Sequence, residues 1–272
     1  MTTLEFLYNT AFGRALLKPL ASRGVSRAAG SFLDTRFSKI FIRSFVRKNN
    51  IREEDYVLDD INSFNDFFCR RIKEGLRIAD EDPNVLIAPC DGLLTAYRIT
   101  SDTVVPVKQS AYTVSELLKD AKLAREFNGG LCLVFRLCVD HYHRYCYVDS
   151  GHKSSNTFLK GVLHTVRPVA LHVRPVFVEN CREYCTIDSP VFGKMVQMEV
   201  GAMLVGRIVN DDNREADVSR GCEKGHFEYG GSTIIVLVQP GSAVLREDIY
   251  ESSLEGIETP VKMGEAVGRS VF

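Results

Sequence analysis

The chain has 272 residues, of which 45% are apolar, and it carries 34 basic and 35 acidic side chains. This length and apolar content suffice for a buried core, in one large domain or in a compact body with an appendage, and argue against a mainly disordered chain. No run of about 18 apolar residues occurs, so a membrane-spanning helix is not expected. The first residues also lack the apolar core and small-residue cleavage site of a secretory signal.

The near-neutral net charge hides a basic N-terminus. Residues 1–50 contain nine Lys and Arg side chains against two acidic ones. Apolar residues recur there at helical spacing with a basic stripe beside them, which indicates amphipathic helices that suit an anionic membrane surface better than nucleic acid. Packing of these helices on the body is the alternative interpretation, and one helix can do both. The apolar residues are Leu4, Tyr8, Ala11, Phe12, Ala15, Leu16, Phe37, Ile40, Phe41 and Phe45, and the stripe is Arg36, Lys39, Arg43 and Arg47.

The cysteines indicate a reducing environment. All eight are scattered through apolar or strand-like contexts of a chain too long to need disulfide staples. This distribution predicts reduced thiols in a peripheral protein on the cytoplasmic side of the cell membrane. Cys181 and Cys185 lack a second pair at zinc-site spacing, so no metal is predicted.

Helices are expected in the first third of the chain. Ser63 opens a capping-box-like sequence, the apolar positions from Phe64 to Ile72 follow a helical period, and Gly75 is a suitable stop. A second short helix is predicted to begin at Thr113, whose capping partner is Glu116 three residues later.

From about residue 85 the pattern changes to short apolar or alternating runs bounded by turn residues, as in strands. The run Thr233–Val238 is apolar at nearly every position, so both its faces should be covered in the middle of the body. The predicted fold class is α+β: a β-rich barrel or sandwich body (residues 81–272), preceded by amphipathic N-terminal helices (residues 1–80). The other predicted strands are Leu93–Tyr97, Leu131–Val139, Val173–Val178, Lys194–Val200 and Met203–Val209.

The run Gly230-Gly231-Ser232-Thr233 permits an unusual backbone reaction. Two glycines allow φ values closed to other residues and leave the Gly231 carbonyl open to the Ser232 hydroxyl. An N-to-O acyl shift requires this geometry. Elimination would then leave one chain ending at Gly231, and the new N-terminal residue would hydrolyse to a pyruvoyl group. Taken alone, the run is equally explained by a turn entering a strand.

An attacking hydroxyl needs a base, and the base needs an orienting group. His141 and His143 lie just after an apolar strand, in the run Asp-His-Tyr-His-Arg, and Asp91 lies in a Pro-Cys-Asp-Gly turn before another strand. Considered singly, each has an ordinary explanation, because histidines at strand ends are usually hydrogen-bonded and Asp-Gly pairs are usually turns.

Together with further motifs in order, these residues make the chain resemble the phosphatidylserine decarboxylase family along nearly its full length. The Gly-Gly-Ser-Thr form and the run Tyr142-His-Arg-Tyr-Cys-Tyr147 resemble the branch found in some anaerobic bacteria. The other matching motifs are Phe64-Asn-Asp-Phe-Phe-Cys-Arg-Arg-Ile-Lys73, Ala88-Pro-Cys-Asp-Gly92, His164-Thr-Val-Arg-Pro168, Phe177-Val-Glu-Asn-Cys-Arg182, Val200-Gly-Ala-Met-Leu-Val-Gly206 and Lys224-Gly-His-Phe-Glu-Tyr229.

The resemblance implies an enzyme that cleaves itself and then converts phosphatidylserine to phosphatidylethanolamine. It implies that Ser232 becomes a covalent pyruvoyl cofactor, that Gly231 becomes a new C-terminus, and that Asp91 and His143 assist the cleavage. The pyruvoyl group would be the electron sink, without a metal. The large and small chains would form a heterodimer, and assembly into a homo-oligomer is left open.

The chain departs from the family pattern near His143. Many relatives have a second histidine three positions later, where this chain has Cys146. A neutral thiol cannot accept a proton in its place, although a thiolate can, so the role of Cys146 is left open. His141 stands where an Asp is common and is a candidate substitute base. His164 and Arg182 match other motif positions and are candidate neighbours of the site.

Two further functions remain open from the sequence. A pyruvoyl decarboxylase of a soluble amino acid would use the same chemistry, but it gives no reason for the basic amphipathic N-terminus. A non-catalytic, membrane-docking β protein would use Gly-Gly-Ser-Thr only as a turn and would stay one intact chain. The decarboxylase interpretation predicts fragments of 231 and 41 residues.

Overall fold

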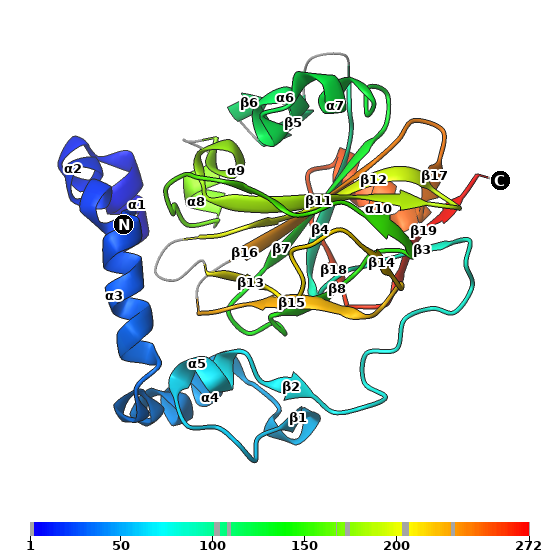
Figure 1. The fold of residues 1–272 in the computed structure, drawn as a ribbon. Helices are drawn as coiled ribbons and strands as arrows, with labels where there is room; N and C mark the ends of the chain where they lie inside the picture. Colours follow the sequence, from blue (N-terminus) through cyan, green and yellow to red (C-terminus); the bar gives the residue numbers. More distant parts are fainter. Residues whose placement is uncertain are drawn as a thin grey trace.

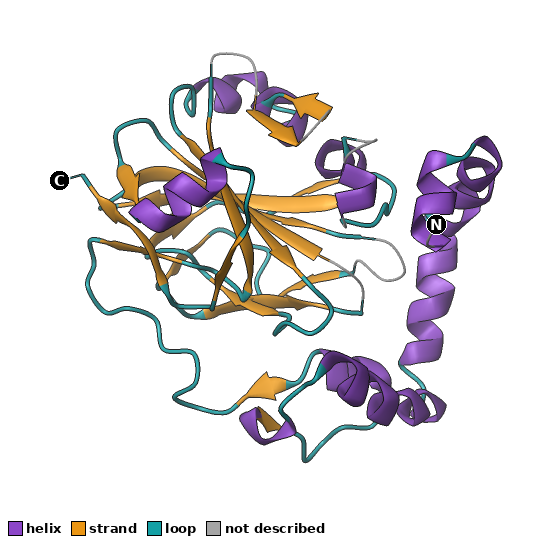
Figure 2. Ribbon diagram, turned by 180° about the vertical axis from the view of Figure 1, so that it is seen from behind, coloured by secondary structure: helices purple, strands orange, loops and turns teal. Residues whose placement is uncertain are grey.

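A β-rich body with a row of helices along one side forms the molecule (Figures 1 and 2). Within the described residues, no helix is long and apolar enough to cross a membrane. All eight cysteines are free thiols. The computed structural model describes residues 3–100, 104–107, 110–166, 168–171, 175–202, 207–229 and 232–271.

The helical row follows the chain order from its N-terminus (Figure 1). Hydroxyl caps start its second and third helices: the Thr10 side chain accepts from the Gly13 amide at 2.9 Å, and Ser22 accepts from Val25 at 3.4 Å. The helices of this row are α1 Thr3–Asn9, α2 Ala11–Leu20, α3 Arg23–Leu33, the 3-10 helix η1 Arg36–Phe41, α4 Ile42–Asn49, the 3-10 helix η2 Glu53–Asp55 and α5 Phe64–Phe68.

The row of helices both packs on the body and exposes apolar side chains. Tyr8 is buried in the core, and Phe45 packs against the aromatic residues of α5. In contrast, Phe37 and Ile40 are 78% and 75% exposed. Packing on the body therefore accounts for the buried side chains of these helices, and membrane contact by the exposed ones stays a prediction. We call the exposed set the apolar helix surface: Phe12, Leu16, Val25, Phe32, Phe37, Ile40 and Phe41.

The helix predicted from Ser63 begins there but ends earlier than predicted. The Ser63 side chain accepts from the Asp66 amide at 3.1 Å, and the helix stops at Phe68. Arg71–Ile72 (β2) instead pairs with Tyr56–Val57 (β1), so pairing with a distant segment overrides the helical pattern. The capping box of Thr113 and Glu116 is confirmed at the start of α6, Val114–Leu118.

The largest sheet has nine strands with β16 in its middle. This strand pairs with β12 on one side and β7 on the other, and every residue in it is buried. The prediction for Thr233–Val238 is confirmed. The strands in spatial order are β14 Ala216–Val218, β9 Gly151–Lys153, β11 Arg182–Ser189, β12 Gly193–Val200, β16 Ser232–Val238, β7 Leu131–Leu137, β4 Gly92–Arg98 and β18 Thr259–Val261, with β10 Thr157–Leu159 pairing β11.

The two faces of β16 supply two hydrophobic cores. Ile235 and Leu237 join the core under α6 and α9, whereas Ile234 and Val236 join the core on the other face. The sheets are open, without a closed barrel among the described strands, so the predicted α+β class is confirmed and the barrel alternative is not adopted. The smaller strands are β3 Val85–Ile87, β5 Val104–Val107, β6 Ser110–Tyr112, β8 Arg144–Cys146, β13 Ile208–Asn210, β15 Glu223–Phe227, β17 Ala243–Leu245 and β19 Ala266–Ser270.

The prediction of a strand at Val173–Val178 is wrong for residues 175–178, the part that the structure describes. Val176–Glu179 forms helix α9, with Pro175 at its N-cap and Phe177 buried. A short apolar run fits a buried helix as well as a strand, and the preceding proline cannot donate to a ladder. In the predicted strand Met203–Val209, residues 203–206 lie outside the described part, and β13 begins at Ile208. The remaining helices are α7 Ala121–Arg125, α8 Pro168–Leu171 and α10 Glu247–Leu254.

Candidate functional site

Ser232 is the first residue of β16, opposite Leu137 of β7. Its side chain is buried, with the residue only 1% exposed. Among the described residues, its hydroxyl oxygen has no hydrogen-bond partner. A buried hydroxyl without a partner is unfavourable, so this one calls for a functional explanation. Gly231, on the other side of the predicted cleavage point, lies outside the described residues.

A compact turn after β7 places His143. Within this turn the His141 amide donates to the Cys138 carbonyl at 3.0 Å, and the Cys138 amide donates to His141 Nδ1 at 3.1 Å. His143 follows, fully buried, and its carbonyl accepts from the Phe227 amide at 2.9 Å. The backbone of His143 is thus held between the turn and β15.

The hydrogen bonds of His143 determine its tautomer. Nδ1 lies 2.9 Å from the carbonyl oxygen of His141, and since a carbonyl only accepts, Nδ1 carries the proton. Nε2 therefore has a lone pair, and within the described residues it has no partner. Burial lowers the pKa of His143 to about 3. The hydrogen bond to the His141 carbonyl opposes this shift, and the charges of Arg70 and His141 add to it to a smaller extent. The ring is neutral near pH 7 and can act as a base.

Helix α5 links His143 to the segment before Ser232. The Phe68 ring centroid lies 4.0 Å from that of His143 and 5.1 Å from that of Tyr229, three residues before Ser232. The Tyr229 amide also donates to the Asn65 side chain at 3.3 Å. One helix therefore covers the candidate base and the approach to the candidate nucleophile.

His141 is in the opposite tautomeric state. Its Nδ1 accepts from a backbone amide, so in the neutral ring the proton is on Nε2. Burial lowers its pKa, and the negative charges of Asp140 and Asp91 partly oppose this shift. While the turn is formed, His141 offers a hydrogen-bond donor and no free lone pair.

Asp91 is held by Arg77, which the sequence analysis did not anticipate. The guanidinium Nε and one terminal nitrogen of Arg77 donate to the two carboxylate oxygens at 2.7 and 2.5 Å, and the Met263 amide donates to Oδ1 at 2.9 Å. No local sequence signal marks Arg77 as this partner.

The sheet register brings Asp91 into the region of Ser232. Arg136 of β7 pairs with Leu93 of β4 on one side and with Thr233 of β16 on the other. The backbones of Leu93 and Thr233 are therefore about 10 Å apart. Asp91 lies two residues before Leu93, and its charge acts on His141. The structure therefore gathers Asp91, His141 and the start of β16 at one end of the central strands.

Cys146 is a buried, protonated thiol. The residue is 1% exposed and packs with Val85 and Ile87. Burial raises its pKa to about 12, so the thiolate is negligible near neutral pH. In this environment the thiol does not provide the missing second base.

His164 and Arg182 have binding partners away from His143. The His164 ring contacts Tyr8 at 3.3 Å and Glu179 at 3.4 Å, which ties α1 to the body. The Arg182 guanidinium donates to four backbone carbonyls at 2.7 to 3.0 Å, which joins the end of α6 to the segment at α9. Both residues thus brace helices in their described contacts.

One group of potential metal ligands occurs in the part of the chain that the structure describes: Cys138, Asp140 and His141. Its ligand atoms lie within 4.8 Å of one another. However, His141 Nδ1 already accepts from Cys138, and burial raises the pKa of the Cys138 thiol. We assign no metal to this turn.

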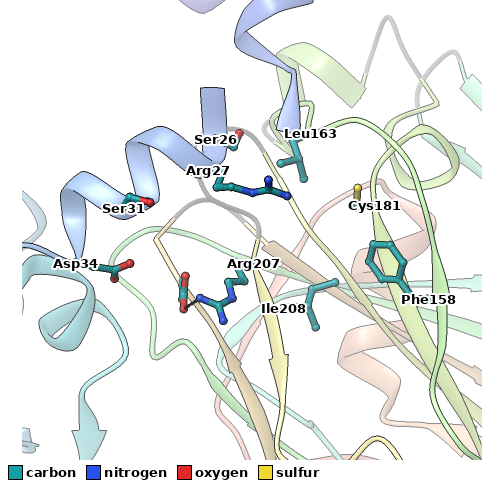
Figure 3. Close-up of a pocket in the computed structure, with 11 residues that line it drawn as sticks. Ser26, Arg27, Ser31, Asp34, Phe158, Leu163, Cys181, Arg207 and Ile208 are labelled. Atoms are coloured by element: carbon teal, nitrogen blue, oxygen red, sulfur yellow. Dashed lines mark hydrogen bonds and ion pairs between the residues drawn. The ribbon is translucent and has the colours of Figure 1, made fainter. Parts of the chain in front are cut away.

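Two cavities, each of about 360 Å³, lie between the N-terminal helices and the body. Figure 3 shows the first, where Arg27 and Asp34 of the α3 segment face Arg207 and Ile208 of the body across the cavity. The second lies beside α5. Asp34 and Glu228 line both, and Glu228 is four residues before Ser232. Both cavities therefore reach the chain segment that leads to Ser232.

Comparison with known proteins identifies the class. The model of the phosphatidylserine decarboxylase family matches residues 64–269. Phosphatidylserine decarboxylase proenzyme 2 of Clostridium acetobutylicum is 43% identical over 98% of this chain and 91% of its own length. The corresponding proenzymes of Ruminiclostridium cellulolyticum and Clostridium perfringens are 38% and 37% identical, over 98% and 97% of this chain and 91% and 92% of their own.

These relatives are named as decarboxylases, a class of carboxy-lyase. The chain belongs to the phosphatidylserine decarboxylase family.

Proposed function

We propose that the chain cleaves itself before Ser232 and then decarboxylates phosphatidylserine to phosphatidylethanolamine. The observation that carries the proposal is a pair of buried groups without partners among the described residues, the Ser232 hydroxyl and the Nε2 lone pair of His143. A hydroxyl nucleophile and a neutral histidine base are the groups that an acyl shift needs.

In the proposed cleavage, His143 Nε2 takes the Ser232 proton while Oγ bonds to the Gly231 carbonyl carbon. The peptide C–N bond breaks, the nitrogen takes the proton, and an ester links the two residues. Removal of the Ser232 Cα proton by the regenerated base then breaks the Oγ–Cβ bond, and Gly231 leaves as a carboxylate. Water replaces the nitrogen of the resulting dehydroalanine, and ammonia leaves.

The surroundings of Ser232 fit the pyruvoyl group that this reaction would leave. Ser232 is paired with Leu137 of β7, and the pairing of β16 with β12 begins at the next residue, in a buried environment that limits water. The pyruvoyl carbonyl would supply the electron sink for loss of carbon dioxide. His143 is our candidate to hold the proton that replaces the carboxyl group, and Asp91 with His141 is our candidate to orient the turn that carries it.

The proposed small chain, residues 232–272, is expected to remain with the large chain as a heterodimer. It contains β16, which lies between β12 and β7, and it contributes β18 and β19, which pair with β4 and β3. Pairing on both sides of a buried strand makes dissociation equivalent to unfolding the sheet.

We further propose peripheral binding to an anionic membrane at the cytoplasmic side of the cell membrane. The apolar helix surface lies on a segment with nine basic and two acidic residues, which suits insertion between anionic headgroups. This surface also favours a lipid over a soluble amino acid as substrate. The cavity in Figure 3 opens under the same helices, at α3.

Intact-mass spectrometry tests the cleavage. Wild-type protein should give fragments of 231 and 41 residues, the smaller with a blocked N-terminus, whereas Ser232→Ala should stay one chain. A single unmodified wild-type chain purified from its native host, without loss of carbon dioxide from phosphatidylserine, contradicts the proposal and favours a non-catalytic docking protein.

Vesicle sedimentation tests the membrane surface. Phe37→Glu with Ile40→Glu should lower binding to vesicles containing phosphatidylserine and lower activity on them, while activity on dihexanoyl phosphatidylserine is retained. The control is Val244→Glu, because Val244 is also apolar and 60% exposed but lies on β17 near the C-terminus (Figure 1). Two results argue against the docking surface. One is an equal loss of vesicle binding in the double variant and in Val244→Glu, and the other is a loss of activity in the double variant on dihexanoyl phosphatidylserine alone.

A further inference from the structure

The second cavity, beside α5, contains a buried cation with unmet hydrogen-bonding capacity. It lies between residues 57–71 and the paired strands β8 and β15. Arg70, Arg144 and His226 line it together with acidic and amide side chains. Arg70 is only 2% exposed, which is rare for an arginine.

The guanidinium of Arg70 is fixed in place but only partly hydrogen-bonded. One terminal nitrogen donates to the carbonyls of Phe67 at 3.1 Å and Phe68 at 3.5 Å. The guanidinium carbon lies 4.1 Å from the centroid of the Tyr56 ring and 4.8 Å from that of Phe67. Nε and the other terminal nitrogen have no acceptor within the described residues.

Such an arrangement is costly unless an acceptor completes it. A buried donor without a partner is destabilising, and more so when it is charged. The aromatic contacts hold the guanidinium plane, so the two remaining donors point in a fixed direction. A planar fork with two donors matches the oxygens of a phosphate or a carboxylate.

Several other charged side chains at this cavity already have partners. Arg144 and Arg71, which both line the cavity, bind Glu223. Asp34 accepts from the Asn65 side chain at 2.7 Å, and Glu228 pairs with Arg207 at 3.2 Å. Unlike these arginines, Arg70 has two donor nitrogens with no described acceptor.

Arg70 also lies next to the candidate base. The Phe68 carbonyl that it binds belongs to the residue whose ring lies 4.0 Å from His143. The positive charge of Arg70 contributes to lowering the pKa of His143. An anion bound by Arg70 would therefore lie beside the residue that we place at the reacting centre.

We propose that Arg70 binds the phosphodiester of the lipid substrate. This inference rests on the proposed function and adds a specificity-determining residue to it. The phosphodiester keeps its charge throughout the reaction, so pairing with Arg70 stabilises the ground state and the transition state alike. The substrate carboxylate, in contrast, loses its negative charge during the reaction. A cation paired with it would stabilise the ground state more than the transition state, which opposes decarboxylation. The unmet donors therefore suit the phosphate.

Steady-state kinetics with dihexanoyl phosphatidylserine tests the assignment. Arg70→Gln should raise KM by about tenfold or more, because charge-assisted hydrogen bonds are lost, and should change kcat much less. Arg269→Gln is the matched control, since the Arg269 side chain is 71% exposed, ion-paired to Asp82 and outside the lining of this cavity, and its KM should equal that of the wild type. Intact mass should show that both variants still cleave.

Competition by headgroup fragments identifies the bound anion. Glycerophosphoethanolamine carries the phosphate and serine carries the carboxylate. Arg70→Lys keeps the positive charge and is used if Arg70→Gln does not fold. In either variant, inhibition by glycerophosphoethanolamine should weaken and inhibition by serine should persist. An unchanged KM in a cleaved Arg70 variant, or weaker inhibition by serine alone, overturns the assignment. A wild-type protein that neither cleaves nor decarboxylates instead overturns the proposed function.

Discussion

Replacing His143 by glutamine should reduce the acid sensitivity of the fold by a calculable amount. The pKa of the buried ring is about 3, against 6.5 for an exposed histidine. Between these values the unfolded chain binds a proton that the folded chain does not. The stability associated with neutral His143 is therefore complete above pH 6.5 and is lost as the pH falls toward 3. From pH 6.5 to pH 5 the loss is about 2 kcal/mol.

Urea unfolding at pH 7 and pH 5 measures this loss. Ser232→Ala provides a background in which one uncleaved chain unfolds, and His143→Gln is added to it. The drop in unfolding free energy on acidification should be smaller in the double variant by about 2 kcal/mol. His141 and His226, whose pKa values are also lowered by burial, affect both proteins equally.

His152 is the control, because its effect on the pH dependence of stability is opposite to that of His143. His152 is exposed, and hydrogen bonds to Glu215 and Asp217 raise its pKa, so it stabilises the fold in acid and this effect fades as the pH rises. Replacing His152 should therefore not reduce the fall in unfolding free energy between pH 7 and pH 5. Equal drops with and without His143 would show that the ring is protonated or hydrated in the folded protein, and the argument for a neutral base would be refuted.

Three further predictions concern buried groups. Cys146→Ser should leave the self-cleavage rate within about twofold by intact-mass kinetics, because the thiol is protonated at neutral pH, whereas His143→Gln should stay uncleaved. Lys224→Met leaves the fully buried Glu199 without its 2.8 Å ion-pair partner, so urea unfolding should show a loss of about 3–5 kcal/mol. Iodoacetamide should label the exposed Cys222 first in the native protein, with buried Cys90 and Cys132 protected until unfolding, as peptide mapping would show.

The sequence predicted those features that depend on neighbouring residues. The all-apolar run of β16 reflects burial on both faces, and the structure divides its alternate side chains between two cores. The capping residues Ser63 and Thr113 bind amides three residues away, so their spacing is visible in the chain. In contrast, the length of α5 depends on pairing of β2 with the distant β1, which no local pattern reports.

The candidate site shows the same division. Ser232, His143 and Asp91 were identified from their residue types and motifs, but their states depend on partners far apart in the sequence or on backbone groups. Arg77 fixes Asp91 across a loop, and a backbone carbonyl fixes the His143 tautomer. Arg182 was a candidate neighbour of the site, yet four carbonyls occupy its guanidinium. Only three-dimensional contacts separate a residue that braces a helix from one with free bonding capacity.

The position of Ser232 within the sheet explains how the fold could tolerate the proposed cut. Ser232 is already paired with Leu137, so a break on its N-terminal side leaves the pairing of β16 with β7 and β12 intact. A break within Thr233–Val238 would instead divide the strand that serves both cores. The same position makes the reaction depend on folding, because the Ser232 hydroxyl and His143 become buried only when α5, β7 and β16 have assembled. A serine at the first paired position of β16 thus places the proposed nucleophile at the end of a strand that is held by its neighbours.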